Sequence, residues 1–153
     1  MKATFKNVAA ALSVLAVIMV GLITVDGLAV ANVSAGTALR VYVVDLNNNP
    51  VHNAQVTVNG ATFYTDNKGL SPAIDIKNLS NCYDSAITEW GTVSVSVKCD
   101  GYVPSLVFNA VVYNAQTRKL TVKAYPRDDS DLPYTIFVES PPDSYVKGLL
   151  NVK

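Results

Sequence analysis

The chain has 153 residues, with 12 Lys and Arg balanced by 12 Asp and Glu, one His and two Cys; 50% of the residues are hydrophobic and 16% are charged. This length fits one domain with a short appendage. A net charge of zero, without a cluster of Lys or Arg along the sequence, disfavours binding to a nucleic-acid backbone. High apolar content at low net charge also excludes an intrinsically disordered chain.

The N-terminal residues 1–31 have the pattern of a membrane-targeting segment. Lys2 and Lys6 precede an uncharged apolar run over residues 8–25, and a small-residue cleavage site ends at Ala31. Two interpretations stay open: a cleaved signal peptide, or a retained membrane anchor, because the run forms a hydrophobic helix just long enough to span a bilayer. In both, the N-terminal lysines keep this end in the cytoplasm. We therefore expect an extracytoplasmic protein, secreted or at the cell surface, that meets the membrane only through this segment.

After a linker over residues 32–37, the hydrophobic period becomes two, which is typical of half-buried strands. Turn residues separate the strands, and Asn59-Gly60 is a strong hairpin signal. The predicted strands cover residues 39–43, 54–59, 61–65, 73–76, 91–99, 102–113, 120–124 and 134–139. Residues 38–125 are thus predicted to form an all-β, Ig-like sandwich of seven to eight strands, followed by an extension over 126–153 with one or two further strands.

Four segments together resemble the carboxypeptidase regulatory-like domains of transthyretin-like fold. They are Leu39–Asp45, Asn49–Gly60, Thr65–Gly69 and Val93–Tyr102, which contain the Asn-Pro-Val turn, the alternating strand after it, a Thr-Asp turn with Gly, and a strand ending in Gly-Tyr. The resemblance covers about residues 38–125. It implies a transthyretin-like sandwich and a non-catalytic accessory module of surface proteins, and the family pattern contains no catalytic residues to carry over.

The two cysteines are separated by a short stretch of chain. Cys82 and Cys99 could close a disulfide in an oxidising compartment, and the alternative is two free thiols. Asn32 and Asn78 begin glycosylation sequons, which matter only in a host that glycosylates surface proteins. We predict the disulfide and treat both asparagines as candidate glycosylation sites.

Residues that could carry chemistry are sparse. His52 follows an Asn-Pro turn and fits a solvated loop position, and one His with two Cys does not supply a zinc site. The stretch that begins at Asp45 starts like a calcium loop, but Pro50 stands where that loop needs Gly, so a β-turn is favoured. Asp128–Asp131 is a second oxygen cluster that fits a solvated connector. We expect no enzyme, cofactor or metal site.

Two hypotheses about function follow from the remaining features. The apolar ends of the chain suggest self-association, or association with another surface protein, in a structural assembly; the candidate assembly residues are Leu28, Val30, Val33, Leu149 and Leu150. The alternative is an adhesion or carbohydrate-binding module that uses the irregular loop 77–90. There Trp90 and Tyr83 could stack on a sugar, or Trp90 could simply anchor the loop.

Overall fold

The computed structural model describes residues 36–127 and 132–152. The predicted N-terminal helix, the cleavage site, Asn32, the assembly residues Leu28, Val30 and Val33, and the Asp128–Asp131 cluster lie outside the described residues. Within the described ranges, no helix has both the length and the apolar character needed to cross a membrane.

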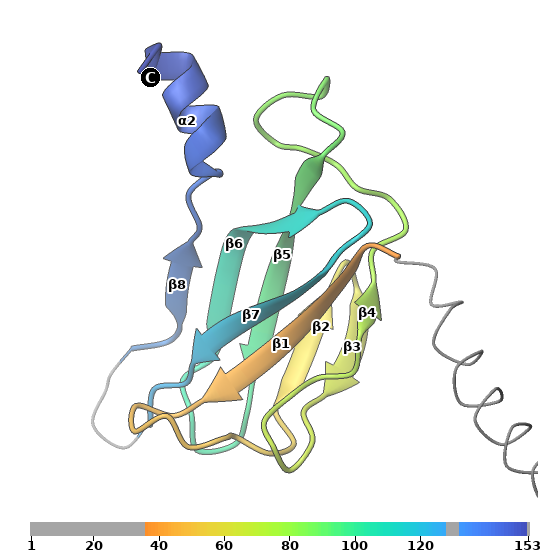
Figure 1. Ribbon diagram of the computed structural model, residues 1–153. Helices are drawn as coiled ribbons and strands as arrows, with labels where there is room; N and C mark the ends of the chain where they lie inside the picture. The colour runs from red at the N-terminus through yellow and green to blue at the C-terminus, as the bar shows by residue number, and fades with distance from the viewer. Residues whose placement is uncertain (1–35, 128–131, 153) are drawn as a thin grey trace, which may run out of the picture. The chain divides into compact units, whose positions relative to one another are not determined.

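The described chain forms a sandwich of two β-sheets with eight strands (Figure 1). The smaller sheet has the order β4-β1-β7 and consists of β1 (Ala38–Val44), β4 (Ile74–Asp75) and β7 (Thr117–Lys123). The larger sheet has the order β3-β2-β5-β6-β8 and consists of β2 (Gln55–Val58), β3 (Ala61–Tyr64), β5 (Trp90–Lys98), β6 (Ser105–Tyr113) and β8 (Thr135–Val138). The predicted all-β sandwich is confirmed at this level, because every predicted strand overlaps an observed one.

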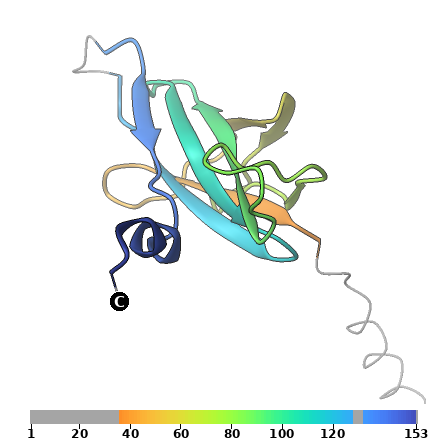
Figure 2. The same cartoon turned by 90° about the horizontal axis from the view of Figure 1, so that it is seen from above.

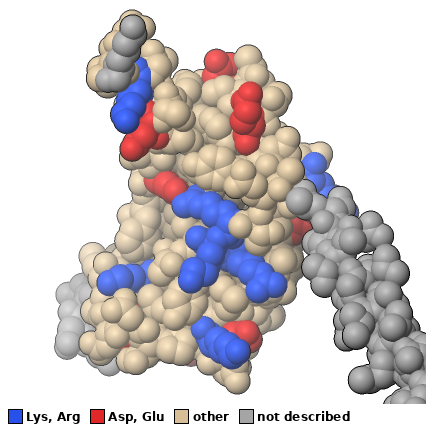
Figure 3. All heavy atoms as spheres, viewed as in Figure 1, with Lys and Arg blue, Asp and Glu red and all other residues tan. Residues whose placement is uncertain are grey.

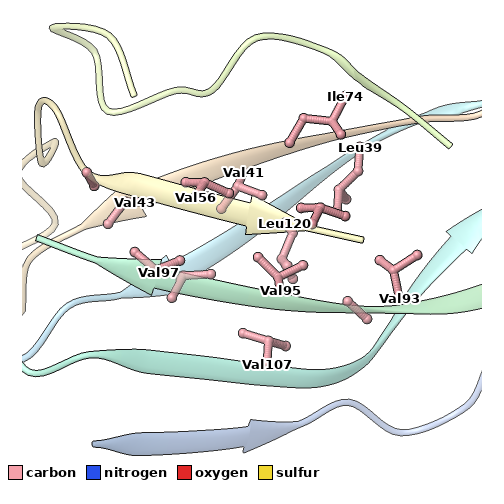
Figure 4. Close-up of a cluster of buried hydrophobic side chains, with 14 of the residues drawn as sticks. Leu39, Val41, Val43, Val56, Ile74, Val93, Val95, Val97, Val107 and Leu120 are labelled. Atoms are coloured by element: carbon pink, nitrogen blue, oxygen red, sulfur yellow. The ribbon is translucent and has the colours of Figure 1, made fainter. Parts of the chain in front are cut away.

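The core lies between the two sheets and is built mainly from small β-branched side chains. Alternate residues of each strand point inward, so that Val93, Val95 and Val97 of β5 are at most 7% exposed, as the alternation in the sequence predicts. Figure 4 shows these valines facing residues of the opposite sheet, among them Leu39 and Leu120. The stability of the sandwich therefore comes from many modest apolar contacts.

The chain changes sheet twice near its C-terminal end. β6 belongs to the larger sheet, β7 pairs in parallel with β1 in the smaller one, and β8 returns to pair in parallel with β6. As a result β7 and β8 form the outer edges of the two sheets on one side of the sandwich, and both views place β8 at the margin of the larger sheet (Figures 1 and 2).

The C-terminal segment ends in a helix that the sequence did not predict. We expected only one or two further strands in the extension over 126–153, but α2 covers Asp143–Leu150 after Pro142, and Asn151 ends it in the left-handed conformation. The helix is only eight residues long and contains Gly148, so its apolar residues span barely two turns, too few for a helical period to be recognised in the sequence.

Candidate functional site

The outer edge of β8 offers unpaired backbone groups. The Thr135 amide donates to Pro104 O at 2.8 Å, and the Glu139 amide donates to Phe108 O at 3.0 Å. Backbone groups alternate in direction along a strand, so the odd-numbered residues of β8 face β6 and the even-numbered ones face away from it. No described strand pairs with β8 on that side. Among the described residues, no strand therefore binds the N–H and C=O groups of Ile136 and Val138, or those of Tyr134 just before β8, and these groups can accept another strand.

The side chains of the same three residues are apolar and exposed. Tyr134 is 57% exposed, Ile136 51% and Val138 67%. They continue the outer surface of β6, where Phe108 is also exposed, and a shallow groove of about 380 Å³ runs between β5, β6 and β8. We call Phe108, Tyr134, Ile136 and Val138 the β8 edge patch. An uncharged edge strand with exposed apolar side chains is a surface suited to strand addition.

An ion pair closes the end of this edge. Where β8 ends, Glu139 accepts a hydrogen bond from the buried Val111 amide at 3.3 Å, and Arg118 of β7 donates to Val111 O. Arg118 also binds both carboxylate oxygens of Glu139. Glu139 and Arg118 therefore form the hydrogen bonds to Val111 of β6 that a longer β8 would otherwise form. The edge that is open to a partner is thus confined to β8 itself.

The opposite sheet presents a cationic face instead. Arg40 of β1 lies directly beside Lys119 of β7 in the parallel register, and Lys123 follows on the same strand; all three side chains are exposed. Lys119 Nζ lies 4.9 Å from the ring centre of Tyr42. Figure 3 shows basic residues gathered over this face. No run of Lys or Arg in the sequence predicts this cluster, because residues far apart in the sequence are brought together by the pairing of β1 with β7.

The predicted aromatic pair of the loop 77–90 does come together, with a third ring. Tyr83 and Trp90 have ring centres 5.9 Å apart, and Tyr145 of α2 lies 5.6 Å from Trp90 and 6.0 Å from Tyr83. Trp90 is only 7% exposed, whereas Tyr83 is 37% exposed. A buried indole has little free ring face for a sugar, so the burial favours the anchoring interpretation of Trp90.

The predicted disulfide is absent: both thiols are free. Cys82 Sγ lies 3.6 Å from Asn109 Oδ1, at a bulge of β6 opposite the middle of β5, whereas Cys99 follows the end of β5 and lies 4.0 Å from His52 O. About five residues of extended strand, roughly 15 Å, separate these places. A disulfide needs Cα atoms within about 7 Å, so this geometry does not permit the bond.

The other candidate residues lie apart from one another. Asn78 is exposed in a bend, and His52 is exposed in a turn. Asp45 accepts hydrogen bonds from the amides of Asn47 and Asn49, both at 2.8 Å, so its carboxylate organises the turn. In the part of the chain that the structure describes, no three His, Cys, Asp or Glu side chains gather as metal ligands would. The glycosylation of Asn78 stays a prediction.

Leu149 and Leu150, the candidate assembly residues at the C-terminal end, are exposed and could therefore contact a partner. Leu149 is 67% exposed and Leu150 65%, on a helix that buries none of its residues. Their role stays a prediction. Assembly was predicted at the chain ends only, and Ile136 and Val138 were missed, although residues 132–138 are uncharged and Pro141 and Pro142 follow after only Glu139 and Ser140.

Comparison with known proteins gives distant likenesses only. No family model matches the sequence, and no curated protein matches it. Among solved structures, the chain is similar to the Bacillus anthracis TIE protein, with a TM-score of 0.41 and 16% identity over 59% of this chain and 16% of that one. It is also similar to two interface mutants of a type II cohesin-X-dockerin complex from Acetivibrio cellulolyticus. The C-terminal interface mutant gives a TM-score of 0.41 and 16% identity over 61% of this chain and 60% of that one.

The N-terminal interface mutant of the same complex gives a TM-score of 0.42 and 16% identity, with 60% of this chain and 58% of that chain covered. The chain thus spans less than two thirds of each of these structures. Likenesses this distant say nothing about what this chain binds. The resemblance to carboxypeptidase regulatory-like domains stays a prediction.

Proposed function

We propose that this protein is a non-catalytic, extracytoplasmic β-sandwich module that serves as a structural subunit of a cell-surface or extracellular assembly. Subunits would join through sheet edges and terminal extensions, in a filament, a surface layer or a coat. The observation that carries the proposal is the β8 edge, where free backbone groups coincide with the exposed side chains of Tyr134, Ile136 and Val138.

Three further features support this proposal. The N-terminal pattern of lysines and apolar residues directs the domain out of the cytoplasm. The resemblance to transthyretin-like accessory domains implies a module without catalytic residues. The exposed leucines of α2, Leu149 and Leu150, provide a second apolar surface at the C-terminal end. A partner would then be a further copy of the chain or another surface protein.

The test is the oligomeric state of the protein isolated from its native envelope. We expect light scattering after size-exclusion chromatography, in a mild detergent that keeps any retained N-terminal segment soluble, to show species larger than a monomer that grow with concentration. Electron microscopy of the same sample checks for regular assemblies. A protein that stays monomeric at high concentration, with no larger particles, contradicts the proposal.

A second candidate function is carbohydrate binding beside the loop 77–90. A groove of about 520 Å³ crosses the outer face of β2, β5 and β6, and its lining, which includes Ser94 and Asn109, contains no charged residue. Asn109 Nδ2 donates to Tyr83 Oη at 3.3 Å, which brings the exposed ring of Tyr83 to the rim. Neutral hydroxyl and amide groups beside an aromatic ring suit an uncharged sugar.

A glycan array distinguishes this candidate from a purely structural role. We expect any bound glycan to be lost in Ser94→Arg, which fills the groove with an exposed side chain. Thr117→Arg, at another exposed position, on the other sheet, is the matched control and should bind as the original chain does. Silence across the array, or binding that survives Ser94→Arg, removes the candidate.

A further inference from the structure

We propose that β8 pairs with β8 of a second copy of this chain, antiparallel about a twofold axis through Ile136. The inference rests on the proposed function, because it names the partner and the register of the edge described above. The two larger sheets would then continue into one another across the axis.

The register follows from the direction of the backbone groups. Only the even-numbered residues of β8 offer N–H and C=O groups to a partner, since the odd-numbered ones bind Pro104 and Phe108 of the same chain. In an antiparallel pair, two residues that exchange hydrogen bonds stand directly opposite each other. With Ile136 on the axis, it faces Ile136 of the other copy, and Tyr134 faces Val138.

The side chains suit this arrangement. Ile136 would meet a second β-branched side chain, and each Tyr134 would meet a Val138, which is an aromatic pair with a β-branched residue. In this arrangement the outer faces of the two larger sheets lie on the same side of the joined sheet. The side-chain pairs therefore lie beside Phe108 and extend the apolar surface of β6. The strand is therefore complementary to itself at every position that can form hydrogen bonds.

The charges of the two edge strands favour pairing between copies at β8 rather than at β7. The facing positions of β8 carry no charge, and Glu139 at its end is neutralised by Arg118 of the same chain, so a second copy meets no like charge. The edge of β7 carries Lys119 and Lys123, and lysines on an edge strand oppose pairing with another strand. Two copies can thus join at β8 without repulsion and are discouraged from joining at β7.

The length of the strand limits what can be built from this contact. Pro133 precedes β8, and Pro141 and Pro142 follow it, so pairing cannot run far beyond the strand. A twofold contact uses the same edge of both chains and is closed. The contact makes a dimer, and any larger assembly needs other surfaces such as Leu149 and Leu150 of α2.

Disulfide trapping tests the register in the full chain. In a background with Cys82→Ser and Cys99→Ser, whose thiols are free in the structure, Ile136→Cys places two thiols on the axis. Residues that exchange hydrogen bonds across antiparallel strands have Cα atoms about 5.5 Å apart, within the range of a disulfide. We expect Ile136→Cys to give a covalent dimer under mild oxidation, as the main species on a non-reducing gel.

Two matched variants fix the register independently. Val138→Cys alone should give little covalent dimer, because its two copies would lie about 13 Å apart along the strands. A mixture of Tyr134→Cys and Val138→Cys chains should cross-link to each other. All three positions are more than half exposed, so the changes leave the core untouched. Efficient trapping by Val138→Cys alone, or none by Ile136→Cys, overturns the register.

The assay separates failure of this inference from failure of the proposed function. If light scattering shows association but Ile136→Cys does not cross-link, assembly uses another surface and only the inference falls. If the chain is monomeric, both fall. As a further discriminator, Ile136→Lys should abolish the dimer, whereas Tyr64→Lys, a similarly exposed change on β3 at the other edge of the same sheet, should leave it intact.

Discussion

Arg118 of β7 and Glu139, just after β8, form an ion pair that joins the two sheets on the side where β7 and β8 are the edge strands. Arg118 contacts both carboxylate oxygens of Glu139, and together they bind the N–H and C=O of the buried residue Val111. The pair is about one quarter exposed, and it lies at the mouth of a cleft lined by Leu120, Val122 and Phe137. It therefore holds the edges of the two sheets together where no described strand does.

Replacement of Glu139 should destabilise the fold more than loss of an ordinary surface ion pair. Glu139→Ala leaves the Val111 amide without an acceptor and Arg118 without its partner, and an unsatisfied buried donor costs about 1–3 kcal/mol. We expect the free energy of unfolding in urea to fall by about that amount. Amide exchange at Val111 should speed up before exchange in the rest of β6 does.

A double-mutant cycle provides the control. Arg118→Ala with Glu139→Ala should cost less than the sum of the two single changes, with a coupling of about 0.5–3 kcal/mol. Strict additivity would show that the two side chains act separately, and would contradict the role given to the pair.

The cationic face of the smaller sheet predicts a stabilising substitution. Arg40 and Lys119 are cross-strand neighbours of like charge, which is unfavourable. Arg40→Glu replaces repulsion by attraction and preserves the contact of Lys119 with Tyr42, so stability should rise by about 0.5 kcal/mol. Arg40→Gln should give part of the gain. The difference between Glu and Gln should disappear in about 1 M salt, and a gain that persists there is not electrostatic.

Gly91 is predicted to be irreplaceable where β5 begins. A Cβ atom there would lie 2.4 Å from Ser80 O, which itself accepts the Thr92 amide, so the backbone of the loop would have to move. Gly91→Ala should lower the free energy of unfolding by about 1–3 kcal/mol. Gly148→Ala in α2 is the control, because its Cβ meets nothing within 4 Å and Ala favours a helix. Equal effects in thermal unfolding would contradict the steric account.

The two thiols should differ in reactivity. Cys82 is exposed, whereas burial, followed by the charge of Asp100, raises the pKa of the Cys99 thiol. Since the thiolate is the reactive form, a thiol reagent near pH 8 should modify Cys82 first and Cys99 slowly. Intact mass after labelling of the unfolded protein should show two free thiols. A native mass lower by two hydrogen atoms, with no labelling, would restore the disulfide that the sequence suggested.

The strands and much of the core could be predicted from the sequence because each depends on local alternation. The valines of β5 alternate with Ser and Thr, and Asn59-Gly60 marks the turn between β2 and β3 without reference to the rest of the chain. The hydrophobic period is a property of neighbouring residues, so one strand can be recognised at a time. This local information was sufficient for the fold class.

The pairing of strands could not be predicted in the same way. Arg40 meets Lys119 only because β1 and β7 are parallel neighbours, and β8 becomes an edge only because β7 crosses to the other sheet. The short separation of Cys82 and Cys99 in sequence suggested proximity, yet an extended strand between them holds them apart. The candidate assembly site depends on such distant relationships, which a single sequence does not contain.

Stability in acid should depend on Asp66, whose carboxylate organises the turn after β3. The amide of Leu70, followed by that of Lys68, donates to it and holds the pKa of Asp66 below its ordinary value of 3.8. A carboxylate with a lowered pKa in the folded state stabilises the fold above its unfolded pKa, and this contribution is lost as pH falls through the lowered value. Asp66→Asn keeps an acceptor oxygen but cannot titrate. We expect the urea midpoint of the original chain to drop more steeply than that of Asp66→Asn below about pH 4, and parallel curves would assign the acid sensitivity to other groups.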